Sequence, residues 1–269
     1  MSYIALDYGD LALAAVLILI QAGLSIALAL NLFRDLVVAA LRMVVQLALL
    51  GVVLEFLFRV VSPWWTGLAV LIMIGFAGRE AVARQSRKLA GLWGYGIGTS
   101  AMLIAATLVT VLALTTAIRP TPWYDPRYAI PLLGMVLGNT LTGVALGLNT
   151  LTVTARRERV AIEAQLALGA DKWTALRPTL REAMRSGLIP IINAMAATGL
   201  VSLPGMMTGQ ILAGASPEDA IKYQLLVMFL IAGATGIGVF AAVYAGAWRL
   251  TDARHRLRLD RLANQPADR

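Results

Sequence analysis

The sequence predicts an all-α, polytopic membrane protein of about seven transmembrane helices, with the N-terminus outside and the C-terminus in the cytoplasm. Of its 269 residues 59% are apolar and 14% are charged, whereas soluble domains carry about 25% charged residues. Stretches of some twenty apolar residues recur, each long enough to cross a bilayer as a helix. Lys and Arg gather in alternate loops, which is typical of cytoplasmic loops in membrane proteins.

Seven apolar segments follow one another, separated by polar loops. The first comes after Asp7 and Asp10 and is too long and too weakly basic at its start for a cleaved signal peptide. Ser62-Pro63 and Ser216-Pro217 are helix starts, each an N-cap residue followed by proline. The expected spans are residues 11–33, 36–58, 63–78, 97–118, 130–153, 186–204 and 220–247.

The basic residues predict the orientation. With the N-terminus outside, the inner segments hold 18 of the 23 Lys and Arg residues, so residues 156–185 and the basic tail 249–269 would be cytoplasmic. The tail is expected to be helical at first and then frayed. The net charge of +8 could suggest nucleic acid. Because the charge lies in short loops between spans, we expect membrane lipid as the partner and no nucleic acid.

Residues 156–185 are the most charged stretch between two spans. The pattern predicts a helix over 157–168 that Gly169 ends, because glycine adopts the left-handed conformation easily. Asp171 is a good N-cap for the next helix. Arg177-Pro178 is expected to break that helix, and Thr179 to start another that runs into the sixth span.

The 157–168 helix carries two apolar stripes. Ile162 and Leu166 form the narrow stripe, beside Arg159 and Glu163. We expect one stripe to rest on the chain's own helices and the other to contact a partner protein, while a helix lying in the lipid headgroups is the alternative. The wide stripe consists of Val160, Ala161, Ala164, Ala167 and Leu168.

Enzymatic catalysis by this chain alone is not expected. It has no G-x-x-x-x-G-K-[ST] phosphate loop, and the glycines between Gly91 and Gly98 lack the following Lys. The single His, His255, lies in the basic tail, and no Ser-His-Asp set is present. The absence of Cys excludes disulfides and thiolate metal sites. We therefore expect no cofactor in this chain.

Polar residues inside the spans are candidates for a translocation pathway. Glu55 and Arg59 are four residues apart, which fits a local ion pair or a carboxylate at the mouth of a pathway. In the fifth span, Asn139 and Thr142 share a stripe that either holds helices together or lines the pathway. Gly134-x-x-x-Gly138 and Gly143-x-x-x-Gly147 would let a neighbouring helix approach closely.

A helix break is expected after the sixth span, at Pro204-Gly205. Backbone groups freed inside a membrane protein must be buried or face a wet cavity, so a gate is one interpretation and an external loop the other. Methionine sulfur suits a soft ion, but no metal-ligand set can be assigned. The candidate gate residues are Asn193, Pro204, Met206, Met207 and Gln210.

The run from Glu163-Ala164-Gln165 to Leu168-Gly169-Ala170 resembles the EAA-type coupling loop of ABC transporter permeases. Together with Pro190-x-x-Asn193, LPGMMTGQILAG and Pro217-x-x-Ala220-x-x-Tyr223-Gln224, it resembles the FetB-type permease family, whose members are described as iron exporters. The resemblance extends over most of the chain and is most specific at residues 160–224.

The resemblance implies a permease domain over residues 1–248 of a multi-pass protein in the inner (plasma) membrane. A separate ABC ATPase subunit would hold ATP and Mg²⁺, and the complex would contain a homodimer of permeases with two ATPases. Ile162 and Leu166, supported by Arg159, Glu163 and Gly169, would fill a groove on the ATPase, and its closure would be transmitted to the break at Pro204.

Alternatives to metal-ion (iron) export remain open at this stage. The cargo could be a hydrophobic or amphiphilic small molecule. The chain could also be an ABC subunit that transmits force without moving a substrate, although its external segments are short. An ATP-independent carrier or channel would leave the charged helix of residues 157–168 unexplained.

Overall fold

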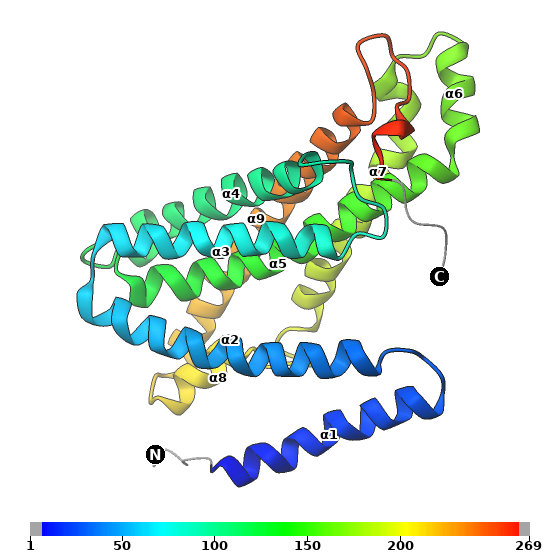
Figure 1. The fold of residues 1–269 in the computed structure, drawn as a ribbon. Helices are drawn as coiled ribbons and strands as arrows, with labels where there is room; N and C mark the ends of the chain where they lie inside the picture. The colour runs from blue at the N-terminus through cyan, green and yellow to red at the C-terminus, as the bar shows by residue number, and fades with distance from the viewer. Residues whose placement is uncertain (1–6, 264–269) are drawn as a thin grey trace. The chain divides into compact units, whose positions relative to one another are not determined.

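The computed structural model describes residues 7–263. These residues form helices and no named strand, and the chain divides into two compact units (Figure 1). The first unit contains α1 and α2, and the second contains α3 to α7, most of α8, and α9. The helices are α1 (Tyr8–Ala27), α2 (Phe33–Val60), α3 (Pro63–Ala83), α4 (Trp93–Leu112) with the π-helical turn η1 (Ala113–Ile118), α5 (Pro126–Arg157), α6 (Arg159–Ala167), α7 (Lys172–Ala197), α8 (Gly205–Leu212), α9 (Pro217–Arg249) and the 3₁₀ turn η2 (Leu259–Arg261).

Six helical segments in the described part of the chain are long and apolar enough to cross a membrane: α1, α2, α3, α4 with η1, α5 and α9. The sixth expected span, residues 186–204, is only the C-terminal part of α7, which stops at Ala197. The first half of α7 carries Lys172 and Arg181 among its charges. Its uncharged part from Ser186 would measure about 18 Å, less than the ~30 Å of a bilayer core.

The expected break at Pro178 is wrong, because α7 continues from Lys172 to Ala197 through Pro178 and Pro190. A proline inside a helix removes one backbone hydrogen bond and crowds the preceding turn. Leu176 and Leu180 on either side of Pro178 are buried. Burial of this face against α5 and α9 therefore outweighs the local cost of the proline.

The first unit is a pair of apolar helices that pack on each other. The turn between them is held by the backbone N–H of Leu32, which donates to the hydroxyl of Ser25 at 3.0 Å. Nearly all of the large apolar side chains of α1 and α2 are exposed. An exposed apolar surface of this size requires a membrane or a protein partner to cover it.

The second unit is built around α5, which contacts α3, α4, α7 and α9. With 32 and 33 residues, α5 and α9 are about 48 and 50 Å long. Both exceed the ~30 Å hydrocarbon core. Their C-terminal ends lie beside α6 and the start of α7 at one end of the unit (Figure 1). The excess length must extend beyond the apolar layer, and we infer that it does so at this charged end, which contains residues 156–185 and is here named the projecting end.

Candidate functional site

The projecting end begins where α5 turns into α6. Glu158 interrupts the two helices with φ −91° and ψ 17°, and Gly169 ends the second with φ +94°, as expected for a glycine stop. Asp171 then caps α7 as expected, because its carboxylate accepts from the backbone N–H of Trp173 at 2.8 Å and from the hydroxyl of Thr174 at 2.7 Å. The hydroxyl and backbone N–H of Thr174 lower the pKa of Asp171.

The two stripes of α6 are oriented opposite to the expected docking arrangement. Ile162 is 3% exposed and belongs to the hydrophobic core, and Leu166 packs partly buried against that core. The expectation that Ile162 reaches out to a partner is therefore wrong. A helical wheel separates the stripes but does not show which of them the preceding helix turns inward.

The wide stripe of α6 faces outward. Val160 is 80% exposed and Leu168 is 89% exposed, with exposed alanines between them. Beside it, Arg159 Nε and Glu163 Oε1 form an ion pair at 2.8 Å. Arg157 pairs with Glu182 of α7 at 3.5 Å, which ties the end of α5 to the helix that follows α6. The site is thus a small apolar surface bordered by charge.

Residues 250–263, here named the C-terminal clasp, fold back over the same end. The expected helical continuation is wrong, because α9 ends at Arg249. Leu262 is buried and pairs with Leu89, and the backbone N–H of Ala263 donates to the Lys88 carbonyl at 2.8 Å. Residues 264–269 lie outside the described residues.

Charged and polar contacts stabilise the clasp. The Arg258 guanidinium hydrogen-bonds to Asp260 and lowers the pKa of that carboxyl to about 2. The backbone N–H of Lys172, at the start of α7, donates to His255 Nδ1 at 3.1 Å. The clasp therefore connects the loop before α4 to the first turn of α7. The basic residues of this segment did not predict the clasp, because many of the contacts that hold it are made by backbone groups.

The expected ion pair on α2 is present. Arg59 Nη2 donates to Glu55 Oε1 at 2.5 Å, and both side chains are exposed. This contact satisfies the carboxylate locally. Whether Glu55 also lines a pathway stays a prediction.

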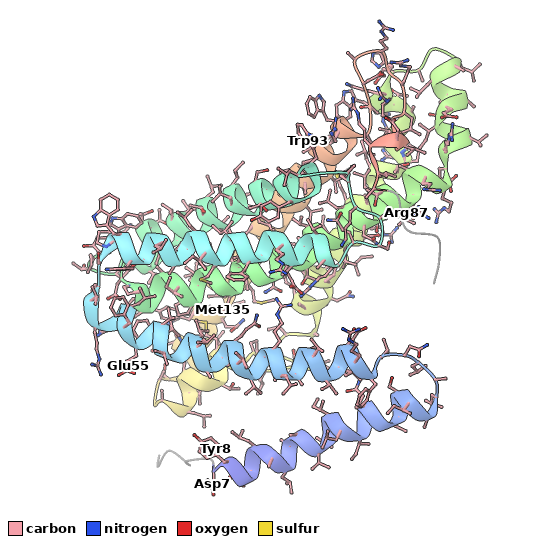
Figure 2. All side chains as sticks on the ribbon, viewed as in Figure 1. Asp7, Tyr8, Glu55, Arg87, Trp93 and Met135 are labelled. Atoms are coloured by element: carbon pink, nitrogen blue, oxygen red, sulfur yellow. The ribbon has the colours of Figure 1, made fainter. Side chains whose placement is uncertain are left out.

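The polar stripe of α5 is partly exposed. Asn139 Nδ2 donates to the Met135 carbonyl at 2.9 Å, and Figure 2 labels Met135 on this helix. Arg84 Nη1 lies 3.5 Å from Thr142 Oγ1. Two turns beyond, Asn149 Oδ1 accepts from both the backbone N–H and the hydroxyl of Ser86, at 2.8 and 2.7 Å.

Arg84, Ser86 and Asn149 were not among the expected site residues. Asn149 lies seven residues after Thr142, so the helical period could have placed it on the same stripe. Arg84 and Ser86 come from the end of α3 and the following loop, and only the packing of α3 on α5 brings them there. A polar strip therefore runs along the α3–α5 contact.

Helices α5 and α7 meet through glycines. A Cβ added to Gly143 would lie 2.9 Å from the Gly187 carbonyl oxygen, and one added to Gly187 would lie 2.8 Å from the Gly143 carbonyl oxygen. The close approach expected at Gly143 is therefore confirmed. At Gly138 an added Cβ would meet nothing within 4 Å, so no helix approaches closely at this glycine of the Gly134-x-x-x-Gly138 motif.

The expected interruption at Pro204-Gly205 is present, because residues 198–204 are non-helical and α8 begins at Gly205. Asn193 is exposed near the end of α7. Met206 packs partly buried against the core, and Met207 is also half-buried. The Oε1 atom of Gln210 is buried without a hydrogen-bond partner among the described residues.

The described part of the chain brings no three His, Cys, Asp or Glu side chains together in a group that could hold a metal ion. In residues 7–263, Asn139 and Asn193 form no hydrogen bond with each other. Within the second unit, the structure thus assembles the α6 surface and the α3–α5 polar strip.

The sequence profile described as UPF0014, "Uncharacterised protein family (UPF0014)", matches residues 8–250. The chain belongs to the UPF0014 family. It is 37% identical over 235 residues to "UPF0014 membrane protein slr1647" of Synechocystis sp., covering 85% of this chain and 87% of that protein. It is 32% identical over 233 residues to "Protein ALUMINUM SENSITIVE 3" of Arabidopsis thaliana, covering 87% of this chain and 83% of that protein.

The expected likeness to the FetB-type family is confirmed. This UPF0014 chain is 32% identical over 248 residues to "Probable iron export permease protein FetB" of Escherichia coli, covering 92% of the chain and 93% of that protein. No solved structure matches the chain. The UPF0014 match runs from α1 to the end of α9, so it includes all six apolar spans and α6.

Proposed function

We propose that this chain is the permease subunit of an ABC transporter, driven by a separate ATPase subunit. The observation that carries the proposal is the exposed apolar stripe of α6, formed around Val160 and Leu168 at the projecting end of the second unit. A short helix with one buried and one exposed apolar stripe suits docking into a groove of a partner. The exposed residues take the docking role first assigned to Ile162.

The contacts of α6 and α7 support a mechanical connection. Ile162 anchors α6 in the hydrophobic core, and Arg157 links the end of α5 to Glu182 of α7. α7 crosses α5 with backbone against backbone at Gly187 and ends just before the interruption at 198–204. Because such a packed helix moves as a rigid element, a push on α6 would reach the interruption and alter access to the pathway.

Docking is tested by two matched double variants. The tagged protein is purified in mild detergent from the membranes of its own cells, and ATP hydrolysis by the co-purified material is measured per mole of chain. Val160→Glu with Leu168→Glu is expected to lower hydrolysis about tenfold or more, because charge replaces the apolar contact. Leu92→Glu with Ala253→Glu, at exposed positions outside α6 and outside residues 198–204, adds the same two negative charges and should leave hydrolysis unchanged. Equal hydrolysis by both variants would refute docking through α6.

We further propose export of a metal ion, iron, as the cargo. The support is the name of the Escherichia coli relative, "Probable iron export permease protein FetB". The alignment with this chain covers 93% of that protein's length. The polar strip along α3 and α5 supplies oxygen groups that a moving cation could contact in passing, and Asn139 and Thr142 lie on it. The proposed complex contains two permease chains and two ATPases in the inner membrane.

The cargo is tested on the complex reconstituted in lipid vesicles. Fe²⁺, kept reduced, is expected to stimulate ATP hydrolysis about threefold or more over Mg²⁺·ATP alone, since a transported ion stabilises the transport-competent state. Zn²⁺, Ca²⁺ and an alkyl ammonium amphiphile serve as comparison compounds. Stimulation by the amphiphile and not by Fe²⁺ would contradict the iron proposal while leaving the permease assignment in place.

A further inference from the structure

A cavity of about 210 Å³ lies in the second unit, at the end opposite α6, between α3, α4 and the start of α5. Its lining includes Val70 and Leu114, with Trp123 and Tyr124 from the loop before α5. The two aromatic rings pack edge to face, with their centroids 6.0 Å apart. The volume exceeds the ~150 Å³ of a cavity that binds benzene. It is therefore large enough for part of an organic molecule.

Two threonine hydroxyls beside this cavity have no hydrogen-bond partner among the described residues. Thr110 is 5% exposed and lines the cavity, and its Oγ1 is buried without a hydrogen bond in the described structure. Thr107 Oγ1, three residues earlier on α4, is in the same situation. A buried hydroxyl without a partner costs free energy, so each needs an explanation. A ligand oxygen that accepts a hydrogen bond would provide one after the threonine side chain rotates about χ1, because both Oγ1 atoms are buried and do not face the cavity in this structure.

The lining also restricts the charge of the ligand. None of the residues that line the cavity is Lys, Arg, His, Asp or Glu. Burying a phosphate or a carboxylate here would leave its charge without a partner, which is strongly unfavourable. The cavity therefore fits an uncharged, mostly aliphatic segment with one or two oxygen acceptors.

The position of the cavity identifies the source of such a segment. It lies where α3 begins and α4 passes into η1, next to the exposed rings of Trp64, Trp65 and Trp123. Exposed tryptophans at the ends of apolar spans typically lie at the level of the lipid esters. We propose that this cavity binds the ester end of one phospholipid acyl chain, with Thr110 and Thr107 donating to the ester carbonyl oxygen.

Gly67 offers a means of filling the cavity. It lines the cavity on α3, and a Cβ added to it would meet nothing within 4 Å. A leucine side chain at this position would therefore enter the space without displacing the backbone. Gly233 on α9 is exposed, also has open space around an added Cβ, and does not line the cavity. Gly233→Leu is thus a matched control for Gly67→Leu.

The experiment counts the phospholipids retained by the full chain after purification in mild detergent with added dioleoyl phosphatidylglycerol, by native mass spectrometry. The wild type and Gly233→Leu are expected to retain one tightly held phospholipid that Gly67→Leu lacks. Thr110→Val keeps the shape of the side chain but removes the hydroxyl, and is expected to weaken retention about fivefold. Melting temperatures measured in parallel show that each variant is folded.

Two outcomes would overturn the proposal. One is equal phospholipid retention by Gly67→Leu and Gly233→Leu. The other appears in a second arm, in which octan-1-ol replaces the phospholipid. If octan-1-ol raises the melting temperature of the wild type but not of Gly67→Leu, while no phospholipid is retained, the cavity binds free amphiphiles and not membrane lipid.

Discussion

At the scale of single residues, the contact between Gly143 and Gly187 leaves no room for a side chain. We predict that Gly187→Ala lowers the free energy of unfolding by about 1–3 kcal/mol, because its Cβ would lie 2.8 Å from the Gly143 carbonyl oxygen. Thermal denaturation in detergent measures the effect. Gly233→Ala, where the added Cβ has open space, is the control and should be neutral or slightly stabilising. An equal melting temperature for both variants would show that α5 and α7 can separate without cost.

The same residues show how far a local pattern reaches. The spacing of Gly143 and Gly147 correctly predicts close helix packing. The equal spacing of Gly134 and Gly138 predicts the same, but Gly138 lies at an open surface. Spacing identifies residues that share a face, but it does not say whether another helix covers that face. Asn139 illustrates the same limit, because its polarity indicates a special position while its partner, the Met135 carbonyl, is local.

At the scale of the element, α6 shows which information a sequence lacks. Its end at the glycine stop follows from local chemistry and could be predicted, whereas it begins at Arg159, two residues later than expected. Which stripe is buried depends on the turn at Glu158, where the direction of α6 relative to α5 is set. That turn places Ile162 in the core and exposes Val160. The proposal that α6 docks through its exposed stripe therefore depends on the structure, and the Val160→Glu with Leu168→Glu variant tests it on this helix alone.

α7 and the C-terminal clasp depart from their local patterns for a common reason. Pro178 lies inside a helix because its neighbours are buried on both sides, and residues 250–263 fold back as the clasp because Leu262 is buried beside Leu89. In both cases tertiary packing outweighs local propensity. The break at Pro178 and the helical continuation after Arg249 were predicted from residues adjacent in sequence, whereas the deciding contacts come from elsewhere in the chain. The fraying predicted for the end of the tail falls on residues 264–269, outside the described residues.

At the scale of the whole molecule, the composition suffices for the class of fold. Apolar runs predict five of the six apolar spans to within a few residues, and the first span begins and ends somewhat earlier than expected. The sixth expected span is the exception, because α7 combines a charged half and an apolar half in one helix. Residues 156–185 and the clasp lie at the same end of the second unit, which is consistent with their shared positive charge. The orientation of this end stays a prediction.

The orientation can be measured directly because the chain contains no Cys. We predict that a membrane-impermeant maleimide added to intact spheroplasts labels Glu218→Cys but not Glu163→Cys. Both native side chains are substantially exposed, so access to the membrane face, and not burial, decides the reaction. After permeabilisation both variants should react to a similar extent, which controls for thiol reactivity. Labelling of Glu163→Cys in intact spheroplasts would place α6 outside the cell, where no ATP-driven partner could reach it, and would remove the basis of the proposed function.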